Sequence, residues 1–195
     1  MKSSRLIYIL CVIAIAHTRA TAAVAIASPA DTVKNLYQLA GNPFQALPAS
    51  VSRLFYVQRT PNANTIVYEL NLDDNGKPDN ETPVHAYWIR YHEKGQKEEL
   101  SYVQRKLAYG ITSKPLSNGR YDIRFVSYKK FPLTLMKGTD GKYHIFATIS
   151  QRQFIVNRIF VKIEGGSFLV PNVRFVEFKG TDPANGKEVT ERFKP

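Results

Sequence analysis

Trp88 and Arg90 are the residues of this chain whose types and spacing best suit ligand binding. They stand two positions apart in an alternating segment, and alternate side chains of a β-strand share one face. A tryptophan offers a large flat apolar surface and an arginine offers a planar cation, so together they hold a ring or an acidic group. We therefore expect Trp88 and Arg90 to border the main concave site of the protein.

Gln104 and Tyr109 are expected to wall the same site from a helix. Both belong to residues 97–109, where Leu100, Val103 and Leu107 follow one another at helical spacing. Acidic residues early in this segment and basic residues late in it complement a helix dipole, and a glycine follows. The turn at 93–96 is short, so the helix can fold back over the face that carries Trp88.

Basic and apolar side chains alternate on three predicted strands, and this alternation predicts which face of each strand points to the core. One set of faces is mixed and includes Arg124, a further candidate for ligand contact: Trp88, Arg90 and His92; Arg120, Asp122, Arg124, Val126 and Tyr128; Val170, Asn172, Arg174, Val176 and Phe178. The opposite faces are apolar and are predicted to be core: Tyr87, Ile89 and Tyr91; Tyr121, Ile123 and Phe125; Val173 and Phe175. The mixed faces then point to solvent or into a polar barrel interior, where arginines need anionic partners. A solvated face with Trp88 covered by the helix is the plainer alternative.

Motifs of the common enzyme classes are missing from the sequence. It has no Gly-x-Ser-x-Gly elbow, no phosphate-binding glycine loop, no His-Glu-x-x-His and no cysteine nucleophile outside residues 1–27. No cofactor or metal site is expected, and His85, His92 and His144 fit surface or wall positions on strands. A hydrolase acting on glycan or lipid stays open as an alternative, with carboxylates such as Glu69 and Asp122 beside His85 or His92 as its acid–base groups.

Residues 1–27 have the three-part layout of a secretory signal peptide. Lys2 and Arg5 precede an apolar run at 6–16, and small residues suitable for cleavage follow at 20–27. The run is shorter than the ~20 apolar residues that a membrane-spanning helix needs, and no other stretch could span a bilayer. Leu10 before the single Cys11 argues against a lipoprotein anchor, since a small residue belongs there. We expect a periplasmic or extracellular protein.

The charge of the mature chain indicates the chemistry of its partners. Removal of residues 1–27 leaves 24 of 27 basic residues against 16 acidic ones, so the net charge falls from +11 to +8. A basic surface favours an anionic or amphipathic small molecule, a glycan or a lipid head group, and it also keeps a protein soluble. Nucleic acid is not expected, because no binding module appears and export removes the opportunity.

Residues 28–52 form an extension with a short helix at 32–40, and 53–195 form a single β-domain. Strands are predicted at 54–59, 65–72, 84–92, 121–128 (prolonged by 133–137), 143–150, 154–164 and 170–179, with a closing segment at 189–193. Asp140-Gly141 predicts the sharpest hairpin. The predicted fold is all-β and mainly antiparallel, with seven to eight strands in a closed or partly open barrel and one amphipathic helix; a two-layer β-sandwich is the alternative.

Three blocks of sequence resemble an uncharacterised family, the domain of unknown function numbered 4833. The blocks are residues 62–69 (Asn-Ala-Asn-Thr-Ile-Val-Tyr-Glu), residues 87–91 (Tyr-Trp-Ile-Arg-Tyr) and residues 99–110, which include Glu-Leu and Gln-Arg-Lys-Leu-Ala-Tyr-Gly. The resemblance covers residues 53–192 and implies bacterial, frequently exported relatives without an assigned activity. It supplies no catalytic residue. Function therefore rests on three hypotheses: an exported binding protein, the hydrolase, and an envelope scaffold that binds a protein through a sheet edge.

Overall fold

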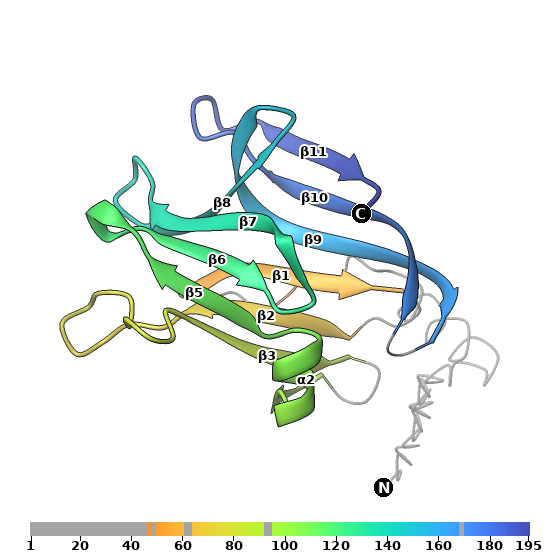
Figure 1. Ribbon diagram of the computed structural model, residues 1–195. Helices are drawn as coiled ribbons and strands as arrows, with labels where there is room; N and C mark the ends of the chain where they lie inside the picture. Colours follow the sequence, from red (N-terminus) through yellow and green to blue (C-terminus); the bar gives the residue numbers. More distant parts are fainter. Residues whose placement is uncertain (1–46, 48–49, 61–63, 92–94, 168–169) are drawn as a thin grey trace, which may run out of the picture.

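The computed structural model describes residues 47, 50–60, 64–91, 95–167 and 170–195, and within them it has eleven strands, one α-helix and one 3-10 turn (Figure 1). The expected signal peptide and the helix at 32–40 lie outside these residues. The strands are β1 (Arg53–Arg59), β2 (Thr65–Leu70), β3 (Val84–Arg90), β4 (Gln96–Glu99), β5 (Ile111–Pro115), β6 (Tyr121–Phe125), β7 (Tyr128–Lys137), β8 (Tyr143–Ile149), β9 (Arg152–Gly166), β10 (Pro171–Thr181) and β11 (Glu188–Phe193). The helix is α2 (Tyr102–Leu107), and η1 is the 3-10 turn Ser117–Gly119.

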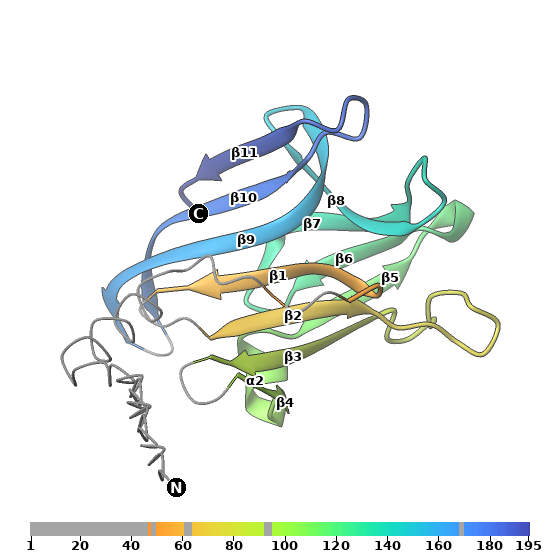
Figure 2. The same cartoon turned by 180° about the vertical axis from the view of Figure 1, so that it is seen from behind.

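The strands form one curled sheet that makes a half-barrel, in the order β4-β3-β2-β1-β9-β8-β7-β6-β5. The half-barrel has two arms, one made of β1 to β4 and the other of β5 to β8. The fifteen-residue β9 joins the arms, because it pairs antiparallel with β8 near its start and parallel with β1 further along. Its other edge pairs with β10, which pairs with β11, so this hairpin extends from the half-barrel as a wing (Figures 1 and 2). The predicted all-β, partly open barrel with one helix is confirmed.

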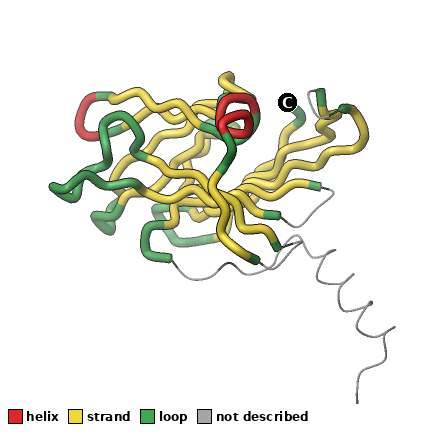
Figure 3. The backbone as a smooth tube through the Cα atoms, turned by 90° about the horizontal axis from the view of Figure 1, so that it is seen from below, coloured by secondary structure: helices red, strands yellow, loops and turns green. Residues whose placement is uncertain are grey.

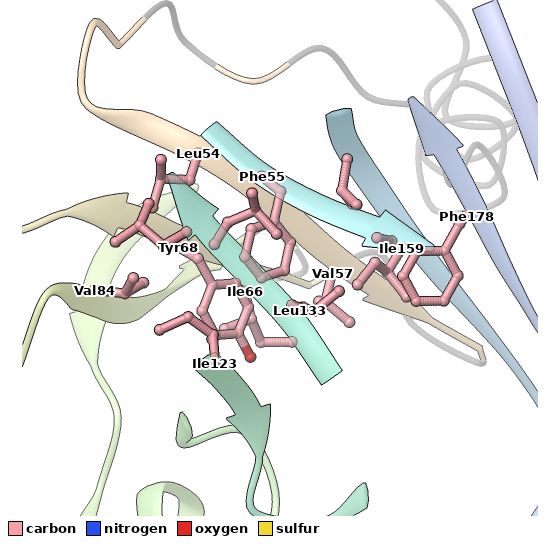
Figure 4. Close-up of a cluster of buried hydrophobic side chains, with 14 of the residues drawn as sticks. Leu54, Phe55, Val57, Ile66, Tyr68, Val84, Ile123, Leu133, Ile159 and Phe178 are labelled. Carbon is pink, nitrogen blue, oxygen red and sulfur yellow. The ribbon is translucent and has the colours of Figure 1, made fainter. Parts of the chain in front are cut away.

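Aromatic packing between the two arms holds the half-barrel together. The rings of Phe55 on β1 and Tyr68 on β2 stack with centroids 4.5 Å apart. Phe125 on β6 meets both rings edge-on, with centroid distances of 6.1 and 5.7 Å. Aliphatic side chains such as Ile66, Ile123 and Leu133 are fully buried around them (Figure 4). One apolar core therefore fills the space between the arms.

The strand count is higher than predicted, partly because residues 121–137 make two strands. They were expected as one prolonged strand, but β6 ends at Phe125, Val126 and Ser127 turn, and β7 returns beside it with Phe125 opposite Tyr128. This turn contains neither glycine nor proline, and Ser127 alone is a weak turn signal. The hairpin predicted at Asp140-Gly141 is confirmed: it joins β7 to β8, and Gly141 has a φ of 76°.

The predicted helix at 97–109 is wrong in its first half. Residues 96–99 form β4 on the edge of β3, where Glu99 lies 2.8 Å from the His85 ring and Lys97 lies 3.8 Å over the Tyr87 ring. Cross-strand contacts of this kind outweigh the charge pattern that suggested a helix start. The helix begins only after Ser101, whose side chain and that of Gln104 form a capping box.

The face assignment of β3 is also corrected. Trp88 was placed opposite the core, yet it is buried in the main cluster between the arms. Tyr87 and Ile89, predicted as core, are buried in a separate cluster that also contains Val67. Since both faces of this strand are apolar, alternation could not tell which face is the inside of the half-barrel.

Irregular pairing corrects the faces of β10. Val176 and Phe178 contact the main core, although they were assigned to the mixed face with Arg174. The register between β10 and β9 shifts between Val173 and Phe175, so two residues of one strand oppose one of the other. A β-bulge of this kind exchanges the faces of the residues that follow it, here as far as the next register shift after Lys179. The assignment on β6 is confirmed, because Tyr121 and Ile123 are buried.

Candidate functional site

A cavity of about 360 Å³ lies between the end of α2, the β6–β7 turn, strand β9 and the wing of β10 and β11. Its volume is within the range of ~300–1,000 Å³ typical of small-molecule sites. The described residues that line it are predominantly apolar: Val57, Arg59, Tyr68, Leu107, Ala108, Tyr109, Phe125, Ser127, Tyr128, Phe131, Ile159, Val161, Ile163, Pro171, Val173, Val176, Phe178, Phe193 and Pro195. Figure 3 shows α2 at the rim of the curled sheet, opposite the wing that ends at the C-terminus. The lining suits an acyl chain or a ring.

Arg59 is the only charged side chain among these described lining residues. It follows Phe55 and Val57 on the inward face of β1, so the strand carries it into the apolar end of the half-barrel. Its guanidinium carbon lies 5.4 Å from the centre of the Tyr109 ring. Its Nε is buried and has no hydrogen-bond partner in the described part of the chain. A buried donor that lacks an acceptor is costly, so this position favours an incoming anion.

Tyr68 and Tyr109 supply the neutral polar groups of the cavity. The Tyr68 hydroxyl donates a 2.7 Å hydrogen bond to the backbone oxygen of Tyr109, which ties β2 to the segment after α2. Burial, and secondarily Tyr109, raise the pKa of Tyr68 well above its ordinary value. Burial also raises the pKa of Tyr109, although the charge of Arg59 acts in the opposite direction. Both phenols therefore stay protonated and uncharged at neutral pH.

Of the five predicted site residues, Tyr109 lines the cavity and Trp88 lies behind it. The rings of Trp88 and Tyr109 meet edge-on with centroids 4.9 Å apart. Trp88 is 4% exposed, and its Nε1 has no hydrogen-bond partner among the described residues. Trp88 thus buttresses a wall of the cavity without lining it.

Arg90, Gln104 and Arg124 are not brought to the cavity. Arg90 lies 3.6 Å from the carboxylate of Glu98 on β4, and Gln104 accepts a hydrogen bond from the backbone of Ser101 at the start of α2. Arg124 donates to Asp122 and to the backbone oxygen of Lys129, each at 2.9 Å. These contacts stabilise the edge of the sheet, the helix cap and the β6–β7 turn. A role of these side chains in binding stays a prediction.

Arg59 was missed in the sequence, although a signal for it existed. It stands at the end of a predicted strand, in line with two apolar residues that alternate towards the core. A cation that continues an apolar face is unusual, since such a residue must enter the core or its rim. Strands β9 and β10 form the wall of the cavity next to Arg59. The sequence around β1 cannot predict this wall, because β9 lies about a hundred residues further along the chain.

The acid–base groups of the hydrolase alternative do not meet at this cavity. Glu69 accepts hydrogen bonds from Tyr87 and Ser50, Asp122 is bound to Arg124, and His85 is bound to Glu99. His92 lies outside the described residues. The part of the chain that the structure describes also has no group of three or more His, Cys, Asp or Glu able to hold a metal ion.

Comparison with known proteins identifies a family and no activity. Residues 55–192 match the family model described as Domain of unknown function (DUF4833), nearly the range of the resemblance seen in the sequence. Searches of curated proteins and of solved structures gave no match. None of the helices in the described ranges is long and apolar enough to cross a membrane. Since the matched residues make up more than half of the chain, the protein belongs to the DUF4833 family.

Proposed function

We propose that this protein is an exported binding protein that holds an amphipathic anionic ligand in the cavity below α2. The main support for this proposal is the buried Nε of Arg59, which has no hydrogen-bond partner among the described residues. Arg59 lines an otherwise apolar cavity. The apolar part of the ligand lies among side chains of β9, β10 and β11, and its acidic group lies on Arg59. A long-chain carboxylic acid is the simplest molecule with both parts.

Electrostatics supports an anion over a neutral ligand. Arg59 is half-buried with its Nε out of contact with water, and no described lining residue offers a carboxylate side chain in return. An arginine in such surroundings gains from a carboxylate or phosphate, because the bonds are charge-assisted and can be bidentate. The apolar lining also favours an acyl chain over a glycan, which would need several polar partners.

Substituting Arg59→Gln is expected to weaken binding of a fluorescent long-chain fatty acid by about 10- to 100-fold. The substitution removes a charge-assisted hydrogen bond, which contributes roughly 1.5–3 kcal/mol. Titration with the fatty acid, followed by its fluorescence, measures this change. The corresponding fatty alcohol has no charge, so its affinity should differ little between the wild type and Arg59→Gln.

Arg120→Gln is the matched control, because Arg120 is exposed and, among the described residues, its side chain bonds to Ser117 in the nearby 3-10 turn. This variant loses the same charge and should keep wild-type affinity. Equal losses in both variants would show that overall charge, rather than the cavity, attracts the acid. Mass spectrometry of molecules that co-purify with the protein from its host gives a second test; a bound neutral sugar would contradict the proposal.

A further inference from the structure

Helix α2 presents apolar side chains to solvent. Tyr102 is 71% exposed, Val103 is 51% exposed and Leu107 is 60% exposed. Val103 and Leu107 are one helical turn apart and lie on the same face. The capping box at Ser101 and Gln104 holds the helix start, so these side chains have a defined position. We call Tyr102, Val103 and Leu107 the α2 ridge.

Positive charge gathers around the ridge. Residues 100–113, which contain α2, carry two basic residues and no acid, and the two acids of β4 lie against other cations: Glu98 against Arg90 and Glu99 against His85. Arg105 and Lys106 are exposed on the helix itself. The helix that carries the ridge is therefore basic.

The β6–β7 turn brings two further cations to the same end of the molecule. The backbone nitrogen of Val126 donates a 2.9 Å hydrogen bond to the oxygen of Gly110, just beyond α2. Lys129 and Lys130 follow this turn and are exposed. Tyr128 and Leu107 line the same cavity and are both exposed, so its rim lies between the turn and the ridge.

We infer that the α2 ridge and the cations Arg105, Lys106, Lys129 and Lys130 dock the protein on an anionic lipid surface. Exposed aromatic and aliphatic side chains enter the interfacial layer of a bilayer, and lysines and arginines around them contact anionic head groups. Charge complementarity favours a lipid surface over a protein partner. An apolar groove on a protein would not require cations both on the helix and on the β6–β7 turn beside it, whereas anionic head groups would contact both. The inference goes beyond ligand binding and is independent of Arg59.

Vesicle co-sedimentation tests the inference with the protein as purified from its host. We expect retention on vesicles of equal parts phosphatidylglycerol and phosphatidylcholine, and at least tenfold weaker retention on phosphatidylcholine alone. Raising the salt from about 0.05 M to 0.5 M should release most of the bound protein. The double variant Tyr102→Ser/Val103→Ser should bind anionic vesicles about tenfold less well.

Leu72→Ser/Leu116→Ser is the matched control, because both leucines are exposed away from α2 and its loss should be negligible. Tyr102 and Val103 do not line the cavity, so Tyr102→Ser/Val103→Ser should keep its affinity for the fatty acid, whereas Arg59→Gln should keep its affinity for vesicles. A second double variant, Lys129→Gln/Lys130→Gln, should weaken retention on anionic vesicles only. Failure of the wild type to bind anionic vesicles, or equal binding by the ridge variant, would overturn the inference whatever the cavity binds.

Discussion

Replacing Trp88 with alanine is expected to lower the free energy of unfolding by about 3 to 5 kcal/mol. Trp88 is 4% exposed in the main core and packs edge-on against Tyr109. Removing the indole leaves a cavity between β3 and the segment after α2, and surrounding side chains fill such a space only in part. Urea denaturation followed by circular dichroism measures the loss.

Tyr102→Ala is the control for this experiment, because it also deletes a large aromatic ring but at a position that is 71% exposed. Its effect should stay within about 0.5 kcal/mol. Trp88→Phe should fall between the two. Trp88→Ala with wild-type stability but weakened ligand binding would instead favour Trp88 as a direct contact for the ligand, as the sequence first suggested.

Replacing Gly180 with alanine is expected to destabilise the protein by about 3 kcal/mol or more. A Cβ atom at this position of β10 would lie 2.0 Å from the backbone oxygen of Ile155 and 2.7 Å from the Phe154 ring. Neither neighbour can move without disturbing the long β9, which joins both arms of the half-barrel to the wing. The register shift between Lys179 and Gly180 marks the same close approach.

Gly76→Ala provides the comparison, since Gly76 has a φ of 70° but no atom within 4 Å of the added Cβ. This substitution costs only the strain of a positive φ, about 1 kcal/mol. Thermal and urea unfolding of the two variants should differ clearly. If Gly180→Ala proved no less stable than Gly76→Ala, close packing of β10 on β9 would not be a requirement of the fold.

Local patterns predicted much of the secondary structure. The alternating segments at 54–59, 65–72 and 143–150 all form strands, and Asp140-Gly141 makes its hairpin. These features depend on alternation and turn chemistry over a few residues, which the sequence displays directly. The helical spacing of Leu100, Val103 and Leu107 gave a wrong helix start, because spacing alone does not show which residues are buried together. Leu100 is buried before the helix begins, whereas Val103 and Leu107 are exposed on the helix.

The sequence by itself determined that this is a β-rich chain, the position of most strands, and membership of the DUF4833 family. Only the tertiary structure decided which face of each strand is inside, because both faces of β3 are apolar and a bulge exchanges the faces of β10. The tertiary structure also decided where the cavity forms. The cavity depends on parallel pairing of β1 with β9, in which Tyr56 lies opposite Arg158, about a hundred residues further along the chain. Such pairing depends on which distant strands bury each other's apolar surface, and that choice leaves no mark in any short segment.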